Sequence, residues 1–116
     1  MINQVLLDGV IVSDIELRSS TKKGTPVVDF RICNREPKAK NPVFIDVEVW
    51  GRQAEMVAEN ASRNTRVLIK GEMRMDNWES RDTGEKRSKH KITADKVIFL
   101  ESQKFLSKDS DSEFAL

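Results

Sequence analysis

The sequence predicts an all-β domain, a five-stranded barrel with one short helix between the third and fourth strands. Two observations lead to this fold class. Up to about residue 100, apolar and polar residues alternate in several stretches, and a period of two is typical of strands that bury one face. The period changes after Gly51, where Ala54, Val57, Ala58 and Ala61 recur three or four positions apart, as on one face of a short helix.

The composition is that of one globular domain with a heavily charged surface. Its 116 residues suffice for a single modest core, and 34% of them are charged against 38% hydrophobic. No apolar run approaches the roughly 20 residues that a membrane-spanning helix needs. The N-terminus lacks the basic start and the cleavage site of a secretory signal, and a single cysteine cannot form a disulfide within the chain. We therefore expect a cytoplasmic protein that does not bind a membrane.

The first two strands are predicted from β-branched and aliphatic runs between turn residues. Val5 to Val12 is such a run, and Gly9 inside it predicts a bend or a bulge. Pro26 opens the second strand, Val27 to Asn34, in which apolar and polar side chains alternate. Residues 36–42 begin with Glu-Pro and end with Asn-Pro, which predicts a loop before the third strand.

The third strand, residues 43–50, is the most informative part of the chain. Side chains on a strand alternate in direction, so one face carries an aliphatic row and the other carries two rings and two carboxylates. The aliphatic row is Val43, Ile45, Val47 and Val49, and the second row is Phe44, Asp46, Glu48 and Trp50. Large rings on a charged sheet face suit stacking against a flat ligand, and unpaired nucleic-acid bases are the commonest ligand of this kind.

The last two strands follow the helix. Arg66 to Trp78 is predicted to form one long strand, which Gly71 interrupts as a strongly coiled barrel strand requires. Residues 79–89 are polar and predict a long hairpin tip, and His90 to Leu100 forms the last strand. The basic run from Lys86 to Lys91 at this tip is expected to contact a nucleic-acid backbone without sequence preference.

This order of strands and helix matches the oligonucleotide-binding barrel, or OB-fold. Several short segments also resemble the bacterial-type single-stranded DNA-binding protein family, in the same order and at the same spacing, over about residues 2–100. The segments are Val5–Val10, the following turn Asp14–Arg18, Phe30–Arg35, Phe44–Glu55, Val67–Arg74 and Asn77–Trp78.

The resemblance implies a barrel that wraps single-stranded DNA without sequence preference during replication, recombination and repair. It implies base stacking by Phe44, Trp50 and Trp78, and phosphate contacts by Arg18, Arg35, Arg52 and Arg74. Arg74 is favoured among the arginines because it shares a strand face with Trp78. The resemblance also implies a homotetramer, although the sequence leaves a dimer open. At the end of the second strand, where the family usually carries a further ring, this chain has Asn34-Arg35-Glu36.

We expect the OB-fold domain to span residues 1–102 and a short acidic, flexible tail to span 103–116. Residues 1–100 hold 18 Lys/Arg and 15 Asp/Glu, net +3, whereas residues 101–116 hold 2 and 4, net −2. The basic body therefore leaves room for a positive stripe. Family tails commonly end in acidic residues and Ile-Pro-Phe, whereas this chain ends Glu113-Phe114-Ala115-Leu116. Recruitment of replication and repair proteins through Phe114 is a hypothesis that this departure weakens.

Asp46 and Glu48 keep a second class of function open, that of a metal-dependent nuclease. Paired carboxylates in such enzymes hold Mg²⁺ and position a water. The alternative for the same residues is ion pairing across strands with Arg31 or Lys70, or acceptance of base amino protons. With one histidine and no phosphate-loop, Cys-x-x-Cys or His-Glu-x-x-His motif, we expect no catalytic residue, no metal site and no cofactor.

A third hypothesis is a small dimeric primosomal accessory protein, or a barrel that binds only protein; the rings on the binding face argue against the protein-binding version. For each ring the alternative is partial burial at a rim or an oligomer interface, and for each arginine it is an ion pair with a nearby carboxylate. Our prediction is a non-enzymatic protein that coats single-stranded DNA at the nucleoid.

Overall fold

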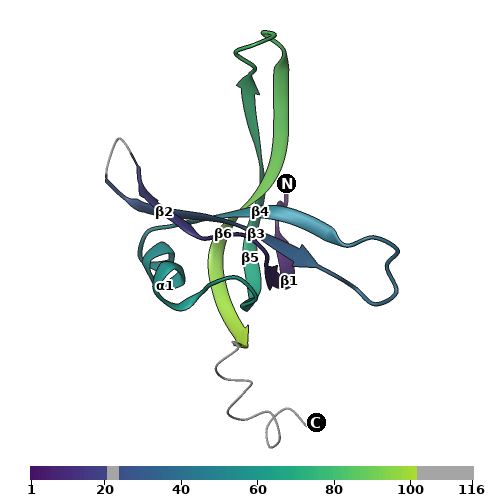
Figure 1. The fold of residues 1–116 in the computed structure, drawn as a ribbon, viewed down its shortest axis with the longest axis vertical. Coiled ribbons are helices and arrows are strands. Elements are labelled where there is room, and N and C mark those ends of the chain that lie inside the picture. The colour runs from purple at the N-terminus through teal and green to yellow at the C-terminus, as the bar shows by residue number, and fades with distance from the viewer. Residues whose placement is uncertain (21–23, 102–116) are drawn as a thin grey trace, which may run out of the picture.

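The computed structural model describes residues 1–20 and 24–101, which form one sheet and one helix (Figure 1). In chain order the elements are β1 (Val5–Ile11), β2 (Glu16–Ser19), β3 (Pro26–Asn34), β4 (Val43–Trp50), α1 (Arg52–Asn60), β5 (Arg66–Glu79) and β6 (Lys86–Glu101). No helix in this part of the chain is both long enough and apolar enough to cross a membrane. The tail predicted at 103–116, with Phe114, lies outside the described residues.

Strand pairing closes the sheet into a barrel. β1 pairs with β5, β5 with β6 and β3 with β4 in antiparallel fashion, and β4 pairs with β6 in parallel. The ring closes between β1 and β3, where Val10 lies opposite Cys33 and Ile11 opposite Ile32. Because α1 lies between the third and fourth of these five barrel strands, the predicted fold class, an OB-fold barrel, is confirmed.

β2 is a strand where a turn is predicted from the sequence, and that prediction is wrong. The resemblance predicts a turn at residues 14–18, but Glu16–Ser19 pairs antiparallel with the first half of β3, from Glu16 opposite Asp29 to Ser19 opposite Pro26. All four residues of β2 are exposed, so the segment has no buried face. Alternation of apolar and polar residues appears only where one face is buried, and the pattern therefore could not reveal this strand.

The core is formed by one side of each barrel strand and by one face of the helix. Val47 and Val49 of the predicted aliphatic row are buried, and Ile45 is partly buried against them. Val43 is instead 50% exposed, because it starts β4 beside the loop that projects from the barrel (Figure 1). The predicted helix face is confirmed: Ala54 and Val57 are fully buried, and Ala58 and Ala61 pack against the same cluster.

Two glycines lie where strands approach too closely for a side chain. A Cβ atom on Gly9 would lie 2.8 Å from the carbonyl oxygen of Cys33, and one on Gly71 would lie closer still to the carbonyl oxygen of Thr93. The pairing of β1 with β5 runs through Gly9 without a register shift, so of the predicted bend or bulge at this glycine the bulge is wrong. The register does shift between Lys70 and Gly71, where β5 coils around the barrel.

The β5–β6 hairpin rises from the barrel as a two-stranded arm, residues 74–90 (Figure 1). Its pairing continues to Glu79 opposite Lys86, so the turn covers only residues 80–85. The predicted tip at 79–89 is therefore too long, and the basic residues from Lys86 onward belong to a strand. Every residue of the arm except Ser80 is exposed, and a strand exposed on both faces shows no hydrophobic alternation.

Candidate nucleic-acid interface

The predicted rings and several charged residues share one continuous face of the sheet. Residues opposite one another in a strand register point to the same side, and the neighbouring strands run in the order β5, β6, β4, β3, β2. We call this side the outer face. Its side chains are Arg74, Asp76 and Trp78 of β5, Lys89 and Lys91 of β6, Phe44, Asp46, Glu48 and Trp50 of β4, Asp29 and Arg31 of β3, and Glu16 and Arg18 of β2.

The three predicted rings are about half exposed. Phe44 is 51% exposed, Trp50 42% and Trp78 46%, which is unusual for large aromatic side chains in a small domain. Phe44 and Trp50 lie at opposite ends of β4, whereas Trp78 lies on the arm. Beside Trp78 the arm forms a shallow pocket of about 500 Å³ between Asn77 to Glu79 and Lys86 to Ser88.

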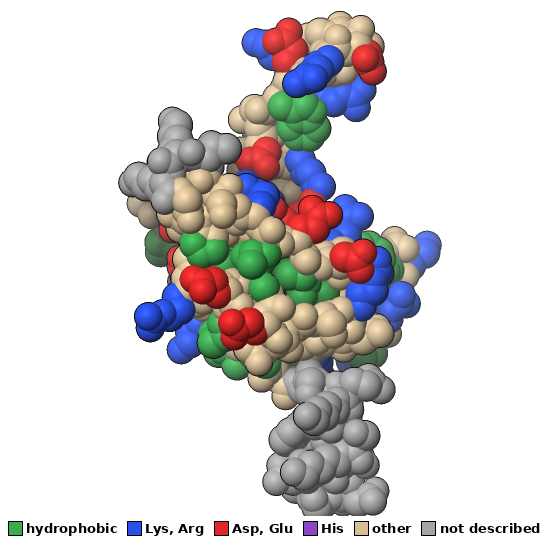
Figure 2. Space-filling model, turned by 60° about the vertical axis from the view of Figure 1, so that its left-hand side comes forward, with side chains coloured by type: hydrophobic (Ala, Val, Ile, Leu, Met, Phe, Trp, Pro, Cys, Tyr) green, Lys and Arg blue, Asp and Glu red, His purple; other side chains and the backbone are tan. Residues whose placement is uncertain are grey.

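A groove of about 620 Å³ runs across the outer face between these rings. It is lined by six carboxylates, those of Asp14, Glu16, Asp29, Asp46, Glu48 and Asp76, and by four cations, those of Arg18, Arg31, Lys89 and Lys91. Carboxylates therefore outnumber cations in the groove. Figure 2 shows the same mixture of acidic and basic side chains on the arm above the barrel. A nucleic-acid backbone meets no uniformly positive strip here.

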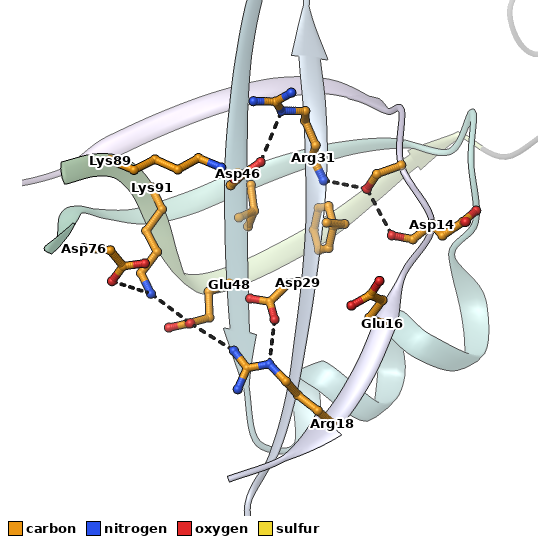
Figure 3. A pocket seen from close by; sticks show the side chains of 13 residues that line it. Asp14, Glu16, Arg18, Asp29, Arg31, Asp46, Glu48, Asp76, Lys89 and Lys91 are labelled. Atoms are coloured by element: carbon orange, nitrogen blue, oxygen red, sulfur yellow. Dashed lines mark hydrogen bonds and ion pairs between the residues drawn. The ribbon is translucent and has the colours of Figure 1, made fainter. Parts of the chain in front are cut away.

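The carboxylates of β4 are held in ion pairs with residues of the neighbouring strands (Figure 3). Asp46 pairs with Arg31 at 3.2 Å and also with Lys89, which confirms the cross-strand pairing with Arg31. Glu48 pairs with Lys91 at 2.9 Å and with Arg18 at 3.4 Å, not with Lys70. These contacts join β2, β3, β4 and β6 into one network.

The network shifts the pKa of two of its cations. Burial disfavours the charged ammonium of Lys91, but hydrogen bonds to Glu48 and to Asp76, at 2.9 and 3.1 Å, outweigh that effect and raise the pKa of Lys91. The hydrogen bond to Asp29 at 2.8 Å is the main cause that raises the pKa of Arg18, against a smaller opposing effect of burial. Both side chains are firmly charged at neutral pH.

The four predicted arginines lie in three different places. Arg18 and Arg74 are on the outer face, and Arg74 pairs with Glu72 at 2.7 Å. Arg52 is exposed at the first position of α1, directly after Gly51, whose φ of 72° permits the sharp turn out of β4. Arg35 lies apart from these, in a second groove of about 790 Å³ beside β1.

The sequence alone gives no site role to Arg31 and does not place Lys89 and Lys91 in the groove. Both lysines reach Asp46 and Glu48 because β6 pairs with β4 in parallel, with Lys91 opposite Asp46. The pairing of two segments so far apart in the sequence cannot be predicted from either segment alone. The sequence does show that Lys89 and Lys91 are two residues apart, which places both side chains on the same face of any strand that contains them.

Comparison with known proteins gives one consistent family. Residues 2–100 match the model of the single-strand binding protein family. Single-stranded DNA-binding protein 2 of Chlorobaculum tepidum is 31% identical over 120 residues, which cover 97% of this chain and 80% of the relative. The single-stranded DNA-binding proteins of Borreliella burgdorferi and Thermotoga maritima are 31% and 37% identical, over 87% and 85% of this chain and 71% and 74% of theirs. The chain belongs to the single-strand binding protein family.

Proposed function

We propose that this protein binds single-stranded DNA by stacking unpaired bases on Phe44, Trp50 and Trp78. The observation that carries the proposal is the exposure of these rings, between 42% and 51%, on one continuous sheet face in a chain of this family. A base stacked on an aromatic side chain contributes about 1–3 kcal/mol, and every base has a face that stacks. Binding by this route is therefore independent of sequence.

Phosphate contacts in this proposal come first from the arginines that have no carboxylate partner. In the described part of the chain, no ion pair or hydrogen bond engages the guanidinium groups of Arg35 and Arg52. Arg52 follows Trp50 by two residues, which favours a contact with the phosphate next to a stacked base. Arg18 and Arg74 contact phosphate only if DNA replaces their carboxylates, so we assign them a smaller share.

The ion pairs favour a binding protein over a nuclease. In a nuclease, Asp46 and Glu48 would hold a metal ion, but each already contacts two cationic side chains. A metal would have to displace Lys89 or Lys91, and of these two only Lys91 has another carboxylate contact, with Asp76 at 3.1 Å. We therefore propose that the protein is not an enzyme and that it acts without a cofactor, coating DNA in the cytoplasm during replication, recombination and repair.

Self-association is a further part of the proposal. Leu6 is 67% exposed, and Ile98 and Leu100 are each 40% exposed, on the side of β1, β5 and β6 that faces away from the core. Within the described residues, Val5 to Gly9 pair along one edge only, with β5. An apolar patch beside an unpaired strand edge suits a second copy of the chain. We propose a homotetramer, and sedimentation velocity distinguishes it from a dimer.

Comparison of single-stranded with duplex DNA tests the proposed function. A fluorescently labelled dT oligonucleotide should bind much more tightly than a labelled duplex of the same length, because paired bases cannot reach the rings. Anisotropy titrations at one salt concentration measure both affinities. Equal affinities would show that the rings do not contribute and that the surface only attracts phosphate.

A further inference from the structure

Glu48 is the one carboxylate that is buried in the described part of the chain. It is 7% exposed, although it lies on the outer face between Asp46 and Trp50. A buried carboxylate is costly unless hydrogen bonds and opposite charges compensate it. The contacts that compensate this charge therefore lie in the middle of the proposed DNA-binding face.

Three donors from three strands converge on this carboxylate. The indole N–H of Trp50 donates to Oε1 of Glu48 at 2.8 Å, while the ammonium of Lys91 contacts Oε2 at 2.9 Å. Arg18 contacts the same Oε2 at 3.4 Å, which is longer than its 2.8 Å bond to Asp29. One oxygen thus holds the ring, and the other holds cations from β2 and β6. Figure 3 shows the contacts of Glu48 with Arg18 and Lys91.

The hydrogen bond to Oε1 restrains the ring without covering it. An indole N–H lies in the plane of the ring, so its acceptor lies at the edge and leaves both π-faces to other contacts. Without this bond, a ring that is 42% exposed would be free to rotate about its side-chain torsions. Ordering a mobile side chain on binding weakens affinity, and a ring that is already fixed avoids that loss.

We propose that Glu48 is a positioning residue for Trp50, which fixes the indole plane through Oε1 before a base arrives and withholds Lys91 from phosphate through Oε2. The inference rests on the proposed function, because it describes how one stacking ring is prepared. Lys91 is the cation concerned, because its other carboxylate contact, with the exposed Asp76 at 3.1 Å, is longer than the 2.8 Å bond that Arg18 keeps with Asp29. The two oxygens have opposite effects on affinity: the first favours stacking, and the second reduces attraction for the backbone.

Two substitutions separate these effects. Glu48→Gln removes the charge but keeps an amide oxygen that accepts the indole N–H, whereas Glu48→Val removes both and retains a strand-forming side chain. Asp46→Asn is the matched control, because Asp46 lies two residues earlier on the same face and pairs with Arg31 and Lys89 without an aromatic partner in the described contacts. The two Glu48 variants and the Asp46→Asn control are all made in a Trp78→Phe parent protein, in which Trp50 is the sole tryptophan.

Time-resolved anisotropy of Trp50 in the DNA-free protein reports ring motion, and titration with a labelled dT oligonucleotide reports affinity. We expect faster local ring motion and about two- to tenfold weaker binding in Glu48→Val only. Glu48→Gln should keep the slow ring and bind at least as tightly as the parent, with a salt slope steeper by up to about 0.7. Unchanged ring motion in Glu48→Val would overturn the proposal. The same ring motion and the same loss of affinity for dT in Glu48→Val and Asp46→Asn would also overturn it.

A second variant keeps the test valid if Glu48→Val does not fold. Replacement of Trp50 by 3-benzothienylalanine keeps the size of the ring but removes the N–H donor. This protein should bind dT about two- to tenfold more weakly than the parent, whereas parental affinity would contradict the assigned role of Glu48. If the parent itself binds no single-stranded DNA, the proposed function fails, but the anisotropy of the free protein still decides whether Glu48 restrains the ring.

Discussion

The indole nitrogen of Trp50 and the buried carboxylate of Glu48 are joined by a 2.8 Å hydrogen bond. This bond connects an exposed ring to the network of ion pairs that lines the groove, because Glu48 also holds Lys91 and Arg18. The outer face therefore combines half-exposed rings with charges that largely neutralise one another. On such a face the affinity for DNA should come mainly from stacking and only secondarily from attraction of phosphate.

Truncation of the rings should weaken DNA binding one ring at a time. Phe44→Ala, Trp50→Ala and Trp78→Ala should each reduce the affinity for a dT oligonucleotide by about 1–3 kcal/mol without unfolding the barrel. Met56→Ala is a suitable control, because Met56 is 41% exposed but lies on α1. Anisotropy titration and thermal unfolding check both points. If all three ring variants bind as well as the control, stacking is not the source of affinity.

The arginines without a carboxylate partner should set the salt dependence. Each phosphate contact on a single strand contributes about −0.7 to the slope of log affinity against log salt. Arg52→Ala should make this slope shallower by about that amount, since Arg52 is exposed just after the C-terminal end of β4. Arg74→Ala should change it less, because Arg74 is paired with Glu72 at 2.7 Å. A larger effect at Arg74 than at Arg52 would reverse the assignment of phosphate ligands.

The raised pKa of Lys91 predicts a loss of stability at high pH. The folded protein holds this proton more tightly than the unfolded chain, so the contribution is complete below the ordinary value of 10.5 and is lost as pH rises through the higher folded pKa. Lys91→Gln should lower the free energy of unfolding by about 1–3 kcal/mol at neutral pH. The difference from wild type should stay constant to about pH 9.5 and then shrink. Denaturant titrations across this range measure it, and a difference that shrinks already between about pH 7 and 9 would contradict the assignment.

The two glycines of close strand approach should differ in their sensitivity to substitution. Gly71→Ala should destabilise the barrel by more than about 3 kcal/mol, because the new Cβ atom would collide with the backbone of Thr93 and Ala94. Gly9→Ala should cost less, about 1–3 kcal/mol, since its nearest atom is the carbonyl oxygen of Cys33 at 2.8 Å. Chemical denaturation gives both values. The reverse order would show that the strand crossing at Gly71 is looser than described.

The sequence predicts the buried parts of this fold well. The alternation in β4 correctly separates Val47 and Val49 from the row of Phe44 to Trp50, because a strand with one buried face must alternate. The spacing of Ala54 and Val57 gives the helix for the same reason. The placement of three rings on an exposed face is likewise contained in the parity of the strands.

The exposed parts were beyond this kind of prediction. β2 and the arm have no buried face, so hydrophobic periodicity did not reveal the strand at residues 16–19 and misplaced the hairpin turn. The ion pairs of Asp46 and Glu48 with Lys89 and Lys91 depend on the parallel pairing of β4 with β6, which only the closed barrel establishes. The net charge of +3 over residues 1–100 also left room for a positive stripe, whereas the groove carries more carboxylates than cations.

Quenching of tryptophan fluorescence by single-stranded DNA tests the central claim most directly. The chain has two tryptophans, so Trp78→Phe reports on Trp50 alone and Trp50→Phe reports on Trp78 alone. Stacked bases quench indole emission, and both single-tryptophan proteins should lose fluorescence on addition of poly-dT and reach a plateau at saturation. Recovery of emission at high salt should accompany release of the DNA. Binding of poly-dT without a change in emission from either tryptophan would contradict a stacking interface on the outer face.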